Sequence, residues 1–136
     1  MKFITRDTSY ALHAICYLAK ENDRIVSVDE LVRELKVPRA FIRKVLQKLN
    51  KKRILKSYKG PHGGFSLNKK SQSIYLLNIM QAFQGPFKLN ECVFKKKPCP
   101  EVKKCQLKKK LDNIEDYIIK ELKEISLEKM ISGKKL

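Results

Sequence analysis

The chain has 136 residues, 31 of them Lys or Arg and 14 Asp or Glu, so its formal net charge is +17 at pH 7. This length suits one compact domain, and a hydrophobic fraction of 43% lies near that of globular proteins, which excludes a disordered basic tail. No apolar run reaches the roughly 20 residues of a membrane span, and the N-terminus lacks a signal-peptide pattern, so we expect a cytoplasmic protein with no membrane partner. The excess positive charge favours nucleic acid as the partner.

Positive charge is concentrated in the middle of the sequence. The segment 36–90 contains thirteen Lys or Arg residues and no Asp or Glu. An ordinary solvated helix face usually carries both signs, because oppositely charged residues four positions apart stabilise a helix. A block of one sign within a folded segment instead favours a surface that binds phosphate groups.

The N-terminal part of the sequence predicts two helices. Apolar residues recur at helical spacing over 8–20, and Thr8 is suited to cap the first helix. Ser27 and Glu30 have the spacing of a capping box, in which the hydroxyl accepts from the Glu30 amide while the Glu30 carboxylate reaches back. A second, short helix should follow and end near Val37, because the next residue is a proline, which disfavours helical geometry in its predecessor.

A third helix is expected directly after Pro38, which suits the first turn of a helix. Its apolar positions lie on one face and its basic positions on the other. Two short helices joined by a tight break are typical of a helix-turn-helix, whose second helix enters the major groove of DNA. Long basic side chains there read guanine edges or hold phosphates. The expected DNA contacts are Arg39, Arg43, Lys44, Gln47 and Lys48.

A glycine-rich turn lies between two short apolar segments, 54–58 and 65–67, and predicts a β-hairpin. Placed after a helix-turn-helix, such a hairpin is typical of a wing. Lys59, Gly60 and His62 near its tip are expected to contact DNA, because glycine lets the backbone approach a phosphate or the minor groove closely. A hairpin that only stabilises the core is the alternative.

The C-terminal half predicts two further helices. Ser73 can cap a fourth helix that ends at Gly85. Beyond a lysine-rich stretch, apolar residues from Leu107 to Ile125 recur at steps of three and four and predict one long amphipathic helix. Since the winged helix already forms a core, we expect this helix to bury its apolar stripe against a second copy, which gives a homodimer.

The expected fold class is therefore mainly α, a winged helix-turn-helix with a small β-hairpin wing and a long C-terminal dimerisation helix. Its expected parts are a DNA-binding domain (1–86), a cysteine-bearing loop (87–106), the dimerisation helix (107–130) and a frayed tail (131–136).

Three of the four cysteines, Cys92, Cys99 and Cys105, lie in the expected loop. In a reducing compartment such thiols are more often metal ligands or redox groups than structural disulfides. Zinc sites more often show a C-x2-C pair, which is absent, whereas iron–sulfur clusters tolerate wider spacing. Reversible disulfides without metal, or cysteines with no ligand, are the alternatives. Cys16 lies on the apolar face of the first helix and is expected to be a small buried hydrophobe.

We do not expect an enzyme. The sequence has no C-x-x-C motif, and neither histidine has an evident Ser or Cys partner by spacing.

Several motifs resemble those of the bacterial IscR/NsrR-type regulators: KFIT at 2–5 with SYAL at 9–12, PRAFI at 38–42, GPHGGF at 60–65 and LNEC at 89–92. The resemblance covers nearly the whole chain. It implies a dimeric winged-helix transcription factor that binds a double-stranded DNA operator under the control of a 2Fe–2S or 4Fe–4S cluster sensitive to nitric oxide, oxidants, iron or cluster demand. By the same resemblance, Cys92, Cys99 and Cys105 are similar to the three cysteine ligands of that cluster.

This sequence departs from the family patterns at the positions that supply the fourth ligand of the cluster. In the cluster-demand regulators a histidine lies two residues past the third cysteine, where this chain has Leu107. In the nitric-oxide sensors a carboxylate from the partner subunit completes the site, and the matching position looks like Ser9, with Asp7 two residues earlier. Asp7 and Ser9 are thus the main candidates, and His13, His62 and Glu101 are further ones. We expect loss of the cluster to disorder the loop and to reset the spacing of the two DNA-reading domains.

Overall fold

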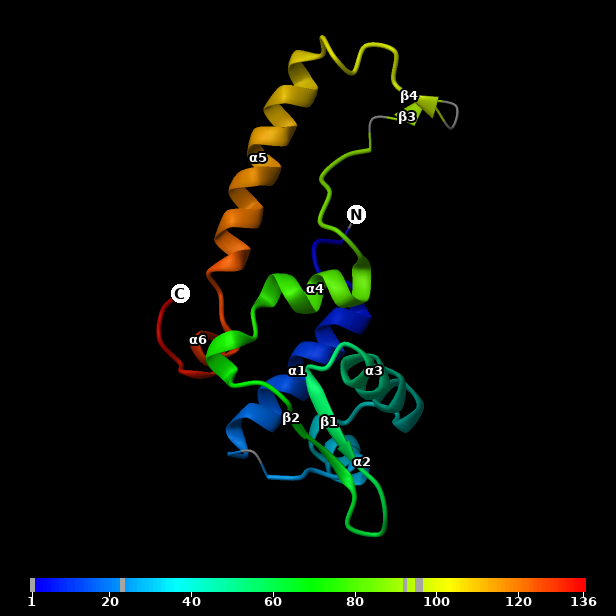
Figure 1. The fold of residues 1–136 in the computed structure, drawn as a ribbon, viewed down its shortest axis with the longest axis vertical. Coiled ribbons are helices and arrows are strands. Elements are labelled where there is room, and N and C mark those ends of the chain that lie inside the picture. Colours follow the sequence, from blue (N-terminus) through cyan, green and yellow to red (C-terminus); the bar gives the residue numbers. More distant parts are fainter. Residues whose placement is uncertain (1, 23, 92, 95–96) are drawn as a thin grey trace.

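The computed structural model describes residues 2–22, 24–91, 93–94 and 97–136 (Figure 1). Its elements are, in chain order, α1 (Arg6–Lys20), α2 (Val28–Leu35), α3 (Arg39–Lys51), β1 (Leu55–Tyr58), β2 (Gly64–Leu67), the 3-10 helix η1 (Ser71–Ser73), α4 (Leu76–Gln84), β3 (Val93–Phe94), β4 (Lys97–Pro98), α5 (Gln106–Lys123) and α6 (Leu127–Ile131). Among the described residues, none of the helices is long and apolar enough to cross a bilayer.

The core forms around α1, which runs through the centre of the molecule and packs against α3, α4 and α6 (Figure 1). Apolar positions at helical spacing on each helix meet there, so the amphipathic pattern of the sequence becomes the packing surface. The buried residues at its centre include Ala11, Ala14, Ile15 and Leu18 on α1, Leu31 on α2, Ile42, Val45, Leu46 and Leu49 on α3, and Leu127 on α6.

The predicted hairpin is present, with β1 and β2 antiparallel and Tyr58 opposite Gly64. The base of the hairpin is tied to the strand-like segment before α2, because Val26 and Phe65 exchange two backbone hydrogen bonds of 2.9 and 2.8 Å. A Cβ atom on Gly64 would lie 2.3 Å from the Val26 carbonyl oxygen. Only glycine therefore allows the wing to approach the segment before α2 this closely.

The first helix begins earlier than predicted. Thr5, not Thr8, is the N-cap, and its hydroxyl accepts from the Thr8 amide at 3.3 Å. The Thr8 side chain is buried and its hydroxyl donates to Gln84 Oε1 at 2.8 Å. The Thr8 hydroxyl, which the sequence pattern predicts to cap α1, is therefore bonded to a residue on α4, 76 positions later in the sequence.

The fourth helix begins later than predicted. Ser73 lies in η1 and its hydroxyl donates to the Lys70 carbonyl oxygen at 2.9 Å, so it does not cap α4. The backbone after η1 is extended and pairs with the connection between α5 and α6. Leu127 donates to the Ile74 carbonyl oxygen at 2.7 Å. This pairing delays the start of α4 to Leu76.

The expected single helix over 107–130 is two helices. The chain leaves α5 at Lys123, because Ser126 forms an antiparallel bridge with Tyr75. Ser126 then caps α6 by accepting from the Lys129 amide at 3.2 Å. Since α6 packs on α1 and Leu127 is fully buried, α6 belongs to the core of the winged domain. The C-terminal part of α5 packs against α4, where Leu122 is buried, while its N-terminal part projects away from the domain (Figure 1).

Candidate nucleic-acid interface and cysteine loop

The second helix of the helix-turn-helix, α3, presents a basic face to solvent. Its other face is buried in the core, which fixes the rotation of the helix. The chain turns from α2 to α3 at Lys36, a left-handed residue with φ of 55°, and Pro38 occupies the N-cap of α3. All five residues predicted to contact DNA are exposed on α3: Arg39, Arg43, Lys44, Gln47 and Lys48.

Some of these side chains already have partners within the chain. Arg39 forms an ion pair with Asp29 in the first turn of α2. Lys44 Nζ lies 3.9 Å from Asp7 Oδ2 on α1. Both pairs are solvent-exposed and so contribute about 0–1 kcal/mol, which a phosphate can replace.

A groove of about 410 Å³ separates the wing from the start of α3. Lys59 and Gly60 line it on the wing side and Arg39 and Arg43 on the helix side. Gly60 has φ of +99°, a conformation that favours glycine. His62 is exposed in the same turn but lies outside the lining of the groove. The structure thus brings together four of the predicted DNA contacts around one concave surface.

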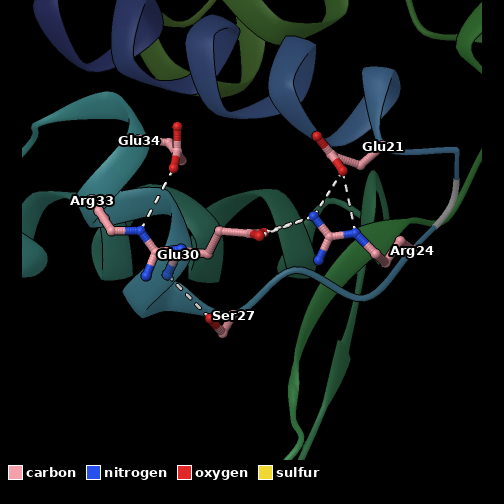
Figure 2. Close-up of polar contacts among 6 residues, drawn as sticks. All are labelled: Glu21, Arg24, Ser27, Glu30, Arg33 and Glu34. Carbon is pink, nitrogen blue, oxygen red and sulfur yellow. Dashed lines mark hydrogen bonds and ion pairs between the residues drawn. The ribbon is translucent and has the colours of Figure 1, made fainter.

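The position of α2, which supports α3, is fixed by a small polar network (Figure 2). As predicted, the Ser27 hydroxyl accepts from the Glu30 amide, at 3.1 Å. The Glu30 carboxylate does not reach back to close the capping box; it accepts from the Arg24 guanidinium, with both oxygens 3.0 Å from Nη2. The same guanidinium donates to Glu21 Oε2 at 2.7 Å, and these two partners raise the pKa of Arg24. Arg24 therefore ties the end of α1 to the start of α2.

Two of the three loop cysteines lie within the described residues. Cys99 and Cys105 are half-buried free thiols, while Cys92 lies outside the described residues. Cys105 is the N-cap of α5, where its Sγ accepts from the Lys108 amide at 3.4 Å. Cys16 is half-buried on α1, and burial raises the pKa of its thiol against the opposing effect of Lys20. Cys16 packs against the core as expected, but it is half-buried rather than buried.

The donor chemistry of the loop fits an iron–sulfur cluster, although the described residues do not form a complete ligand set. Cys105 caps the N-terminus of α5, and exposed Lys97, Lys103 and Lys104 lie close to Cys99 and Cys105 in the sequence. Thiolates in a basic loop suit an anionic cluster. Within the described part of the chain, no three His, Cys, Asp or Glu side chains converge on one point.

The candidates for a fourth ligand lie in different places. Glu101 is exposed and shares the loop with Cys99. Asp7 starts α1 and faces Lys44, whereas Ser9 and His13 line a surface hollow of about 500 Å³ near the connection from α2 to α3. The turn that carries His62 lies at the opposite end of the molecule from the cysteine loop (Figure 1).

Glu115 on α5 binds the first residues of the cysteine loop through hydrogen bonds that the sequence analysis did not predict. We call these contacts the Glu115 clasp. This α5 residue is 8% exposed, and its carboxylate accepts from the Leu89 amide at 2.9 Å and from Lys88 Nζ at 3.2 Å. The Leu89 hydrogen bond, aided by the Lys88 charge, lowers the pKa of Glu115 against the opposing effect of burial. A carboxylate on the apolar face of α5, four residues after Leu111, was the available sequence signal.

A second connection joins the loop to the N-terminal arm and was also missed. At the end of α4, the Gln84 side-chain oxygen accepts from the Thr5 amide at 3.1 Å, and its amide group donates to the Phe3 carbonyl oxygen at 3.0 Å. The Phe3 ring packs edge-on against Phe87, with 5.3 Å between centroids. No local pattern in the sequence marks Gln84 for this position.

Comparison with known families identifies the protein class. The model of the Rrf2 family, described as an iron-dependent transcriptional regulator, matches residues 4–133. The chain belongs to the Rrf2 family of transcriptional regulators. This assignment agrees with the regulatory, non-catalytic role expected from the sequence.

Relatives of this Rrf2 regulator support the assignment. An HTH-type transcriptional regulator of Aquifex aeolicus is 40% identical over 92 residues, which cover 68% of this chain and 64% of that protein, so the match spans less than two thirds of this relative. The HTH-type regulator NsrR of Oceanobacillus iheyensis is 25% identical over 128 residues, covering 93% and 87% of the two chains. The expected resemblance to IscR/NsrR-type regulators is confirmed.

A solved structure confirms the fold class. CymR of B. subtilis, described as a global cysteine regulator, superposes with a TM-score of 0.78 at 20% sequence identity, over 99% of this chain and 100% of that chain. At this identity the similarity bears on the fold only. The Rrf2 regulator therefore has the expected winged helix-turn-helix architecture.

Proposed function

We propose that this Rrf2 regulator is a cytoplasmic homodimer that binds a double-stranded DNA operator and whose affinity is switched by an iron–sulfur cluster held by Cys92, Cys99 and Cys105. One observation carries the switch. The first residues of the cysteine loop are fastened both to α5, through Glu115, and to the N-terminal arm, through Phe87 and Phe3.

The DNA-reading part of the proposal rests on α3 and the wing. Exposed Arg43, Lys44, Gln47 and Lys48 project from one helix face, and the groove beside them is bordered by Lys59. An α-helix of this kind fits the major groove, and the wing then lies next to the phosphate backbone or the minor groove. Gly60 and His62 at the tip are the backbone and side-chain contacts proposed there.

Dimerisation through α5 is supported by its exposed apolar side chains. Leu107 and Tyr117 are 66% and 65% exposed, and Ile114 is 40% exposed. The C-terminal part of α5 packs against α4, but its N-terminal part projects away from the winged domain (Figure 1). A second copy, related by twofold symmetry, buries such a stripe and places two α3 helices on one side of the DNA.

A bound cluster supplies a covalent cross-link between segments of the loop and a group that oxidants or nitric oxide destroy. Asp7 or Ser9 of the second copy, or Glu101, serves as the fourth ligand. Glu115 and Phe87 then couple the conformation of the loop to the rest of the chain. The Glu115 clasp anchors the loop on α5, and the Phe87 contact anchors it on the N-terminal arm (residues 2–5), which leads into α1. The first turn of α1, directly after this arm, carries Asp7, whose carboxylate lies 3.9 Å from Lys44 Nζ on α3.

The first test is anaerobic purification followed by visible absorption, iron and acid-labile sulfide analysis. Wild type should be coloured and contain near-stoichiometric iron and sulfide, Cys99→Ser and Cys105→Ser should lose both, and the matched control Cys16→Ala should retain them. Affinity for an operator selected from random duplexes should differ between loaded and cluster-free protein. Equal affinity refutes the switch, and a cluster retained in the two serine variants refutes the ligand assignment.

A metal-free thiol regulator is the second candidate, favoured by two free, half-buried thiols in one short segment. In this case Cys99 and Cys105 form a reversible disulfide when a peroxide takes up two electrons and two protons. Protein that stays colourless after iron and sulfide reconstitution, but gains a Cys99–Cys105 disulfide by mass spectrometry and changes DNA affinity, supports this candidate.

A further inference from the structure

A group of exposed basic residues lies beside the expected DNA contacts and has no assigned role. We name it the lateral basic surface; it consists of Lys51, Lys52 and Arg53 after α3, Lys56 on β1, and Lys69 and Lys70 after β2. In the part of the chain that the structure describes, no carboxylate lies within ion-pair distance of these six residues, whereas Arg39 and Lys44 on α3 face Asp29 and Asp7. The lateral basic surface therefore carries six positive charges that no carboxylate among the described residues balances.

The lateral basic surface continues the DNA-reading face of α3. Lys44, Lys48 and Lys52 follow one another at steps of four residues, which places them on successive turns of one helix face. Lys52 is the C-cap of α3. A duplex that lies against α3 can therefore meet positive charge beyond the end of the helix.

A hydrogen bond at a strained residue, Arg53, joins the turn after α3 to the loop after β2. Arg53 has φ of 60°, a left-handed conformation that is costly for a residue with a side chain. Its amide donates to the Asn50 carbonyl oxygen at 2.9 Å, and its own carbonyl oxygen accepts from Asn68 Nδ2 at 2.9 Å. Asn68 thus joins the end of α3 to the loop that carries Lys69 and Lys70.

The surface contains two adjoining hollows. One, of about 330 Å³, is lined by Lys52 and Lys69 together with the polar side chains of Asn78 and Gln81 on α4. The other, of about 310 Å³, is lined by Lys56, Lys69 and Lys70 together with Ser66 and Tyr58. Ammonium, amide and hydroxyl groups are the side-chain donors that contact DNA phosphates.

We propose that the lateral basic surface binds the sugar–phosphate backbone of duplex DNA that flanks the operator, beyond the base pairs read by α3 and the wing. This inference rests on the proposed DNA-binding function. Phosphate contacts carry no sequence information, so the flanking DNA contributes affinity and register irrespective of its sequence.

The test compares two duplexes: the shortest operator that wild type binds after selection from random DNA, and the same operator with one extra helical turn of unrelated sequence, about ten base pairs, at each end. The variant is Lys52→Gln/Lys69→Gln/Lys70→Gln. The matched control, Lys109→Gln/Lys120→Gln/Lys123→Gln, removes the same charge from exposed positions that share one face of α5, opposite Leu107. Affinities are measured at 50 and 200 mM salt.

Wild type and the α5 control should bind the extended duplex more tightly than the short one. The lateral variant should keep its affinity for the short operator and lose the gain from the flanks. Each lost phosphate contact should lower the salt slope by about 0.9, which over this salt range is about 3.5-fold in affinity. Equal losses on both duplexes, or the same loss in the α5 control, overturn the inference. If selection returns no operator for wild type, the proposed function fails instead.

Discussion

The Glu115 clasp makes a quantitative prediction about the start of the cysteine loop. The Glu115→Ala substitution removes the acceptor of the Leu89 amide, a hydrogen bond to a charged group, and the contact with Lys88. The first is worth about 2 kcal/mol; the second is small, because the Lys88 side chain is 62% exposed. A loss of about 2 kcal/mol corresponds to roughly 30-fold faster hydrogen exchange at the Leu89 amide.

Amide hydrogen exchange measured by NMR at neutral pH tests this prediction. Glu115→Gln should show a smaller increase, since the side-chain oxygen still accepts but without charge. Asp116→Ala, an exposed neighbour on α5, is the control and should leave the exchange rate unchanged. Because the pKa of Glu115 is lowered in the folded protein, the carboxylate stabilises the clasp fully above the ordinary Glu pKa of about 4.3. This stabilisation is lost as the pH falls through the lowered value. An unchanged Leu89 exchange rate in Glu115→Ala refutes the clasp.

Three further predictions address the wing, the dimer and the DNA surface. Gly64→Ala should destabilise the fold by about 1–3 kcal/mol in urea unfolding, because the new methyl group meets the Val26 carbonyl oxygen; Gly133→Ala, at a positive φ but with nothing near the new methyl, should cost less. Tyr117→Asp should shift the protein from dimer to monomer in analytical ultracentrifugation, and a retained dimer argues against α5 as the interface. Arg43→Ala should weaken operator binding by about 1–3 kcal/mol and relax the preference at one base pair if it reads a guanine, whereas a uniform loss across sequences identifies a phosphate contact.

The helix-turn-helix and the hairpin could be predicted because their signals are local. Pro38 and the glycine-rich turn fix where α3 begins and where the wing reverses, and both effects act over a few residues. The same applies to Ser27, whose hydroxyl needs only the amide three residues on. These elements therefore have the expected order and nearly the expected bounds.

The remainder depends on contacts between segments far apart in the sequence. Thr8 is a residue type that often caps helices, but its hydroxyl donates to Gln84, 76 residues later in the sequence. Apolar spacing continues through Ile125, yet the bridge between Ser126 and Tyr75 ends the helix. Glu115 interrupts an apolar stripe that a period-based reading treats as continuous. The spacing of apolar residues predicts which face of a helix is buried. It does not predict which polar side chains form hydrogen bonds with residues far away in the sequence.

The packing of α6 against α1 has a consequence for how the protein is made. Leu127 is one of the buried residues of a core that begins with Ala11, so the full core forms only after α6 has left the ribosome. At a synthesis rate of about 5–20 residues per second, roughly 5–20 s pass between the synthesis of α1 and that of α6. The cysteine segment is translated within that interval. The full core of the winged domain therefore forms only after the cysteine segment has been synthesised.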